Sequence, residues 1–133
     1  MLRAVSIRVV RLGSKRTKGE GLRLGTVRRP PRAVPKSEWA RRDFYDVWLP
    51  DLAPSDALLK TAQSAVLDER SWKAFARSYR KEMAQPTARR LLALLAALSL
   101  ETNLAVGCYC EDEARCHRSL LRALLVESGA QVE

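Results

Sequence analysis

The stretch that most constrains the fold is residues 106–121, VGCYCEDEARCHRSLL. Its apolar beginning predicts a buried strand, the acidic residues that follow predict a turn, and the segment from Cys116 onward predicts a helix. The start of a helix presents unpaired backbone N–H groups and the positive end of the helix dipole, so anions bind there. The sequence therefore predicts a candidate site at this strand-to-helix turn, within residues 104–128.

The rest of the chain alternates apolar strands with amphipathic helices. The predicted strands cover residues 5–10, 22–27, 44–50 and 103–110. The predicted helices begin after Ser55, at Ser71 and at Pro86, and a last one covers residues 115–128. This order predicts an α/β fold, a small mixed sheet flanked by helices, and 133 residues predict one domain over residues 1–133.

Two details of the predicted strands carry structural expectations. The strand at residues 44–50 is largely apolar on both faces, which predicts a central position in the sheet. Its exception, Asp46, needs an arginine or backbone donors nearby if it is buried. Gly25 indicates either a bulge or a close approach by another part of the backbone.

The basic charge is concentrated in the N-terminal third, residues 1–42. The whole chain has a formal net charge of +9, and residues 1–42 contain 13 Lys and Arg against two acidic residues, a net charge of +11. The remaining residues therefore carry a net charge of −2. Such asymmetry favours an anionic partner, which could be nucleic acid, a phosphorylated ligand or an acidic protein, and the alternative is a solvated basic surface.

Three arginines of this third lie on a stiff segment, RRPPRAVP. Pro30 and Pro31 force an extended path, so the side chains of Arg28, Arg29 and Arg32 are held in place before a ligand arrives. A pre-ordered guanidinium loses less entropy when it binds a phosphate or carboxylate. We therefore predict these arginines as anion ligands, with a plain connecting loop as the alternative.

The other candidate ligands belong to the strand-to-helix turn. Backbone N–H groups beside Cys116 and His117, together with Cys110 and the guanidinium of Arg118, could bind phosphate or carboxylate. In the alternative interpretation, Arg118 pairs instead with the acidic residues of the turn, which are Glu111, Asp112 and Glu113.

Cys116 is the candidate catalytic residue, because the field of a helix start stabilises a thiolate. His117 is the nearest base, but adjacent side chains on a helix diverge by about 100°, so the two do not simply pair. The C-x5-R spacing of a phosphatase-like loop is absent, since only four residues separate Cys110 from Arg115. Cys108 is more typical of a small buried apolar residue.

Metal binding is a further hypothesis, but we predict no metal and no cofactor. Cys108, Cys110, Cys116 and His117 offer four ligands of the kinds that zinc prefers. However, C-x-C-x5-C-H is not a familiar zinc spacing, the Cys-His pair is poorly placed to converge, and Cys108 lies one strand step inside the sheet. The chain has neither a Walker loop nor a GxGxxG motif.

The sequence predicts a cytoplasmic protein with no membrane association. Its longest apolar run is about half of the roughly 20 residues that a membrane helix needs. Arg3, Arg8 and Arg11 interrupt the N-terminal apolar stretch, which is unlike a signal peptide. Three cysteines, two of them one residue apart, do not form the framework of a secreted disulfide protein.

Several of these segments together resemble a bacterial family catalogued as domain of unknown function 488. They are RRPPRAVP, YDVWLPDLAPS, GCYCEDEARCHRSLL and the helical pattern of Trp72, Phe75, Tyr79 and Glu82. The resemblance covers nearly the whole chain and is closest to the branch that keeps the Cys-His-Arg triplet. It implies a small cytoplasmic α/β protein and supplies no reaction. Some members are labelled transcriptional regulators, although this chain has no helix-turn-helix pattern.

The sequence thus predicts an α/β domain with one anion-binding cleft, lined on one side by the arginine segment and on the other by the turn and helix start. The ligand would be a phosphorylated metabolite or a nucleic-acid end, and Cys116 would be reactive. The alternative is a non-catalytic nucleic-acid-binding module that uses the basic N-terminal third. In a third interpretation, the triplet only stabilises the start of a helix.

Overall fold

Four strands form a single parallel sheet in the computed structural model, which describes residues 5–65, 68–110 and 116–133. The strands are β1 (Ile7–Arg11), β2 (Leu22–Gly25), β3 (Val47–Trp48) and β4 (Leu104–Cys108), in the spatial order β1-β4-β2-β3. The predicted α/β class is confirmed, but each pair is parallel where a mixed sheet was expected. Parallel pairing brings the carboxyl ends of the strands to one edge of the sheet.

The strand expected in the centre is in fact an edge strand. β3 has only two residues, and Val47 and Trp48 are 45% and 36% exposed. β3 pairs only with β2, and β4, in which all five residues are buried, lies in the interior of the sheet between β1 and β2. The apolar pattern of residues 44–50 arises instead because Tyr45, which is 0% exposed, packs outside the strand against Gly25. A Cβ atom on Gly25 would lie 2.2 Å from the ring of Tyr45, so a side chain, not a backbone, makes the close approach.

In the described ranges, three α-helices lie between β3 and β4, and a fourth follows β4. They are α1 (Asp56–Ser64), α2 (Glu69–Met83), α3 (Pro86–Ser99) and α4 (His117–Glu127). Short 3-10 helices cover Lys36–Glu38 and Pro50–Leu52. Within the described ranges, no helix is long and apolar enough to cross a membrane.

The helix starts follow from their capping residues. Ser55 caps α1 as predicted, because its side chain accepts a hydrogen bond from the N–H of Leu58. Pro86 occupies the first turn of α3, also as predicted. α2 begins earlier than expected, because Asp68 is the capping residue and Ser71 completes a capping box with it.

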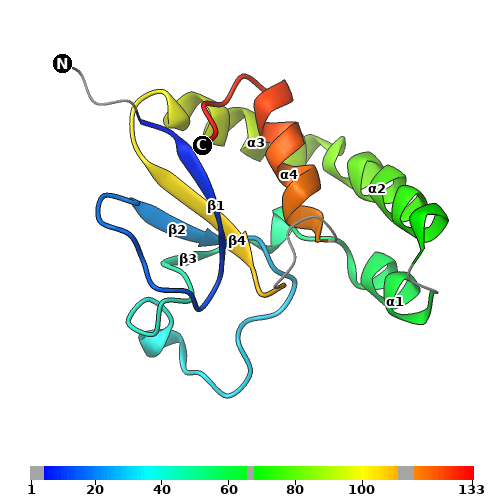
Figure 1. The fold of residues 1–133 in the computed structure, drawn as a ribbon, viewed down its shortest axis with the longest axis horizontal. Helices are drawn as coiled ribbons and strands as arrows, with labels where there is room; N and C mark the ends of the chain where they lie inside the picture. The colour runs from blue at the N-terminus through cyan, green and yellow to red at the C-terminus, as the bar shows by residue number, and fades with distance from the viewer. Residues whose placement is uncertain (1–4, 66–67, 111–115) are drawn as a thin grey trace.

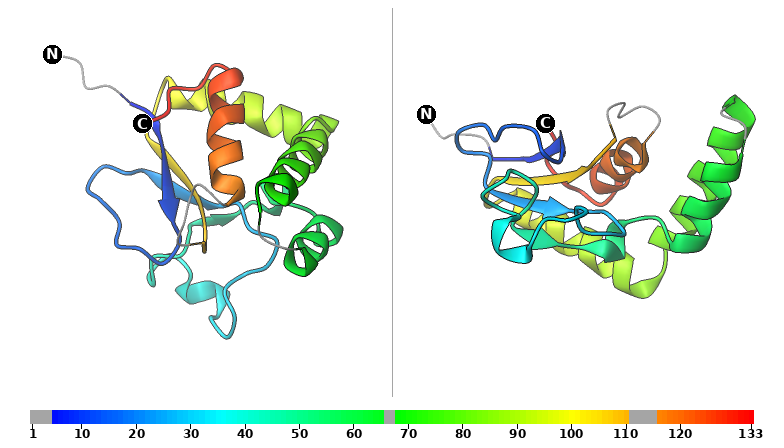
Figure 2. Two further views of the ribbon diagram at one scale, coloured as in Figure 1. Left: turned by 45° about the vertical axis from the view of Figure 1, so that its right-hand side comes forward. Right: turned by 90° about the horizontal axis from the view of Figure 1, so that it is seen from below.

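The main core lies between the sheet and α2, α3 and α4. In Figure 1 these helices lie above and to the right of the sheet, whereas the long loops before β2 and β3 lie to its left and below. The buried side chains of this core come from these three helices and from β1, β2 and β4, and they include Ile7, Leu24, Tyr79, Met83, Leu92, Leu95, Val106, Leu121 and Leu125. Figure 2 shows α1 and α2 together, on the side of the molecule toward which β2 and β4 end.

Buried charges fix the loops on the other side of the sheet. Arg23 is 0% exposed and binds the carboxylate of Glu20 at 2.9 Å, as well as the carbonyl oxygens of Ser14 and Asp43. Asp46 accepts hydrogen bonds from the guanidinium of Arg16 and from the backbone N–H of Arg23, both at 2.8 Å. Asp46 thus has both kinds of partner that a buried aspartate would need, although the residue itself is exposed.

Candidate functional site

Three cysteines meet where β4 ends and α4 begins. Cys108 is the last residue of β4, Cys110 lies just beyond the strand, and Cys116 is the residue that caps α4. Their Sγ atoms all lie within 4.8 Å of one another, and those of Cys108 and Cys116 are 2.6 Å apart. Cys108 and Cys116 are each 2% exposed, whereas Cys110 is exposed. The cluster therefore has two buried sulfurs beside one that solvent reaches.

Two expectations from the sequence argued against this convergence, and the backbone geometry overturns both. Cys116 has φ −122° and ψ 152°, which is extended rather than helical, so the divergence of adjacent helical side chains does not apply to Cys116 and His117. The Sγ atom of Cys116 consequently lies 3.7 Å from Nδ1 of His117. Cys108 reaches the cluster because β4 ends at this residue, at the edge of the sheet that faces α4.

His117 is buried, and its two ring nitrogens have different neighbours. Nε2 lies 2.7 Å from the carbonyl oxygen of Thr26, which can only accept a hydrogen bond, so Nε2 carries the proton. Burial lowers the pKa of His117, which keeps the ring neutral. Nδ1 therefore presents a lone pair toward the sulfur of Cys116.

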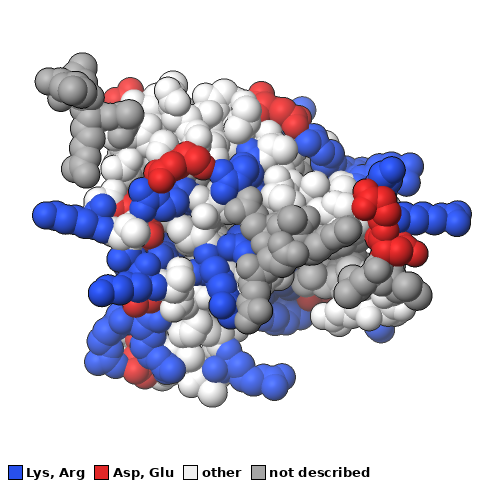
Figure 3. Space-filling model, in the orientation of Figure 1, with Lys and Arg blue, Asp and Glu red and all other residues white. Residues whose placement is uncertain are grey.

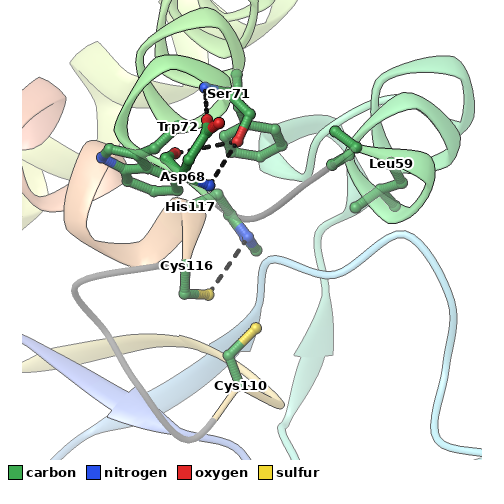
Figure 4. Close-up of a pocket in the computed structure, with 10 residues that line it drawn as sticks. Leu59, Asp68, Ser71, Trp72, Cys110, Cys116 and His117 are labelled. Carbon is green, nitrogen blue, oxygen red and sulfur yellow. Dashed lines mark hydrogen bonds between the residues drawn. The ribbon is translucent and has the colours of Figure 1, made fainter.

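A cavity of about 290 Å³ adjoins the cysteine cluster. Its lining is mostly apolar and comes largely from α1 and α2 and the residues next to them: Leu59, Ala62, Ala65, Asp68, Ser71, Trp72 and Phe75. Cys110, Cys116 and His117 complete the lining. In Figure 4 the two sulfurs lie at one end of the group, and His117 lies between them and the start of α2. One part of the cavity is thus lined by apolar side chains of α1 and α2, and the other by two cysteines and a histidine.

A family model described as the active DUF488-N3 subclade matches residues 7–129. The chain belongs to the DUF488 family. The matched range includes the arginine segment, the cavity and the cysteine cluster, so the resemblance predicted from the sequence is confirmed. The curated proteins and the solved structures gave no match.

In this DUF488 chain the three thiols do not titrate alike. Hydrogen bonds from Cys108 and then Cys116 lower the pKa of Cys110, and the positive charge of Arg118 acts in the same direction. Donating to Cys110 raises the pKa of Cys108, and burial adds to this rise. For Cys116 the hydrogen bond from Cys108 lowers the pKa, but donation to Cys110 and burial outweigh it, and the pKa is raised. The thiolate is therefore favoured at Cys110, whereas the sequence predicted Cys116.

Arg118 is only 4% exposed and contacts the chain that leaves β4. Its Nη2 donates to the carbonyl oxygen of Cys110 at 2.6 Å, while its buried Nε has no hydrogen-bond partner among the described atoms. Glu111, Asp112 and Glu113, the partners considered from the sequence, lie outside the described residues. Arg118 thus holds Cys110 in position, and its role as an anion ligand stays a prediction.

The arginines of the N-terminal segment do not line the cavity. Arg28 donates to the carbonyl oxygens of Ala53 and Pro54, and Arg29 pairs with Asp56 at 3.0 Å. Arg32 is exposed. The anion-binding role of these three residues also stays a prediction, but the structure does not bring Arg28, Arg29 and Arg32 together with Cys110 and Cys116 in one cavity.

Sequence reasoning missed the residues that form the cavity wall. Helical spacing alone predicts that Trp72 and Phe75 pack in the core; Phe75 does pack against it, but both side chains are partly exposed and line the cavity. Thr26, which orients His117, had no recognisable signal because only its backbone carbonyl is used. The one signal in the sequence that could have indicated a cavity wall is the presence of several large aromatic side chains on one helix, more than packing against the core requires.

Proposed function

We propose that this chain is an enzyme for a small molecule that occupies the cavity, with the reacting end of the molecule against Cys110. The observation that carries the proposal is the exposed sulfur of Cys110 at the end of a cavity with apolar walls. Thiols are the strongest nucleophiles and the softest ligands among the lining side chains. The description of the matched subclade as active agrees with a catalytic role.

The lining indicates the chemical class of the substrate. Leu59, Trp72 and Phe75 offer apolar and aromatic contacts, so the body of the substrate is apolar or aromatic. At the other end, the first N–H groups of α4 follow Cys116, and helix starts attract negative charge. We therefore expect a polar or anionic reacting end, which retains the anion binding predicted from the sequence.

Cysteine labelling tests the position of the substrate. The reduced protein, kept free of metal with a chelator, is treated with iodoacetamide or with an aryl iodoacetamide, and the modified residue is identified by mass spectrometry. We expect Cys110 to react first, and to prefer the aryl reagent because its ring binds beside Phe75. An aromatic contact of about 0.5–1.5 kcal/mol corresponds to a preference of about 2- to 10-fold.

A matched pair of leucines provides the control. Leu59 lines the cavity, whereas Leu94 is 53% exposed on α3 and does not. Leu59→Ala and Phe75→Ala are expected to reduce the preference for the aryl reagent, and Leu94→Ala is expected to leave it unchanged. Equal preferences in all three variants, or first reaction at Cys108 or Cys116, would refute the proposed position of the substrate.

The second candidate function is a non-catalytic nucleic-acid-binding module, which the net charge of +11 in residues 1–42 favours. Figure 3 shows Lys and Arg side chains gathered on the left and lower parts of this face, where the loops of the N-terminal third lie. Part of this charge is already paired, because Arg16 contacts Asp46 and Arg41 contacts Glu38. Paired arginines contribute less to phosphate binding, so we place this function second.

Salt dependence distinguishes the two functions. A nucleic-acid binder loses affinity steeply as salt rises, and each exposed lysine contributes a little. Lys15→Gln with Lys18→Gln would then weaken binding to a duplex in a fluorescence anisotropy titration, whereas Lys60→Gln with Lys73→Gln on the helices would not. If neither pair changes the binding, or none is seen at low salt, the second function is excluded.

A further inference from the structure

We infer that Cys108, Cys110 and Cys116 together bind one thiophilic divalent cation of the Zn²⁺ class. Sulfurs from the end of β4, from the residue two positions beyond it and from the cap of α4 converge within 4.8 Å. Thiolates are preferred ligands of Zn²⁺ and of other soft cations. The inference deepens the proposed function and rests on it in one respect, because the cation would meet the reacting end of the same substrate.

The spacing of the sulfurs suits a tetrahedral cation after a small adjustment. Zn–S bonds of about 2.3 Å place the sulfurs of a tetrahedral site about 3.8 Å apart. The three Sγ atoms already lie within 4.8 Å of one another. Cys108 and Cys116, at 2.6 Å, would separate by about 1 Å, which a rotation of one side chain provides.

Burial makes the cation more favourable than three bare thiols. Cys108 and Cys116 are each 2% exposed, so water does not reach their sulfurs. S–H groups are weak donors and sulfur is a weak acceptor, and thus thiols satisfy one another poorly. A divalent cation supplies the opposite charge that buried thiolates require.

The cavity gives the cation a fourth coordination position. Cys110, Cys116 and His117 line the cavity, so the cluster has one side that faces it. Nε2 of His117 bonds to the carbonyl oxygen of Thr26, which leaves the Nδ1 lone pair facing the cluster, where it can accept a hydrogen bond from a cation-bound water. Three protein ligands with an open fourth position is the arrangement of catalytic rather than structural zinc sites.

Cobalt titration tests the inference. Metal-free, fully reduced full-length protein is titrated with Co²⁺ under anaerobic conditions and followed by absorption spectroscopy. We expect one equivalent per chain, a sulfur-to-cobalt charge-transfer band, the visible bands of tetrahedral Co²⁺, and displacement by Zn²⁺. An absent band, or the weak spectrum of octahedral Co²⁺, would overturn the inference.

Variants identify the ligands. Cys110→Ser is the first choice because Cys110 is the exposed cysteine, and its affinity for Co²⁺ is expected to fall by about 100-fold or more. His117→Gln keeps all three sulfurs and is expected to retain the charge-transfer band. Circular dichroism checks that both variants fold. Unchanged affinity in Cys110→Ser, or loss of the band in a folded His117→Gln, would contradict a site made of three sulfurs.

The two proposals fail separately, because the labelling experiment is done without metal. Preference of Cys110 for the aryl reagent together with no Co²⁺ binding would leave the substrate position intact and remove the cation. Tight Co²⁺ binding without that preference would retain the cation and remove the substrate position. A disulfide between Cys108 and Cys116 that persists after treatment with a strong reductant would also exclude the cation site.

Discussion

Arg118 determines where the exposed sulfur lies. Its guanidinium is buried and donates to the carbonyl oxygen of Cys110, so it ties the chain just beyond β4 to the first turn of α4. Arg118 therefore acts on the site indirectly, by positioning Cys110. The same triplet thus supplies a sulfur at Cys116, an imidazole at His117 and a positioning contact at Arg118.

Arg118→Met is expected to destabilise the protein. Methionine keeps much of the aliphatic volume but leaves the Cys110 carbonyl without its donor, which costs about 1–3 kcal/mol of unfolding free energy. Urea denaturation measures this change. Arg90→Met, on the exposed side of α3, is the matched control and is expected to change stability by less than about 0.5 kcal/mol. Equal stabilities of the two variants would show that the contact with Cys110 has no energetic role.

At the scale of elements, one carboxylate connects the two helices that form the cavity wall. Glu82, near the end of α2, accepts hydrogen bonds from both the backbone N–H and the hydroxyl of Ser55, the cap of α1. The position of α1 relative to α2 therefore depends on Ser55. Leu59 on α1 and Phe75 on α2 face the same cavity as a result.

Ser55→Ala is expected to loosen this wall. Losing a capping hydroxyl costs about 1 kcal/mol, and the carboxylate of Glu82 loses one of its two donors. We expect lower stability in urea and a smaller preference of Cys110 for the aryl reagent. Thr61→Ala, on the exposed face of α1, removes a hydroxyl that only contacts its own helix and is expected to change neither property. An unchanged preference of Cys110 for the aryl reagent in Ser55→Ala would show that the cap of α1 does not affect the cavity.

At the scale of the whole molecule, two ion pairs link the loops of the basic N-terminal third to the sheet: Arg23 with Glu20, which is buried, and Arg16 with Asp46, which is not. Burial alone would raise the pKa of Glu20 and of Asp46, but contacts with Arg23 outweigh it for Glu20, and contacts with Arg16 and Arg23 outweigh it for Asp46. Both carboxyl groups therefore have a pKa below their ordinary values of 4.5 and 3.8. Part of the positive charge of this third therefore stabilises the fold, because Arg16 and Arg23 pair with carboxylates of the same chain.

These shifts predict acid sensitivity. A carboxyl with a lowered pKa in the folded chain contributes stability that is present above its unfolded pKa and is lost as the pH falls through its folded pKa. The unfolding free energy is therefore expected to fall below about pH 4.5. Asp46→Asn is expected to be less stable at neutral pH but to lose less stability on acidification, as measured by urea denaturation at several pH values. An identical pH dependence in both proteins would contradict this role of Asp46.

The sequence by itself determined which segments form helices and strands and where the candidate site begins. Hydrophobic periodicity, Ser55 and Pro86 are local signals, and neighbours along the chain are enough to decide them. The same local pattern located Cys110, Cys116 and His117 at a strand-to-helix turn. Tertiary structure decided what local patterns do not encode, namely the edge position of β3, which depends on how Tyr45 packs on Gly25.

The tertiary structure also decided which side chains share the site. The extended backbone at Cys116 turns its sulfur toward Cys108 and His117, against the helical geometry assumed from the sequence. The cavity wall comes from α1 and α2, distant in sequence from the cysteines, and the arginine segment instead contacts Ala53, Pro54 and Asp56. Such contacts depend on how complete helices pack on the sheet, and packing is a property of the whole chain rather than of any one segment.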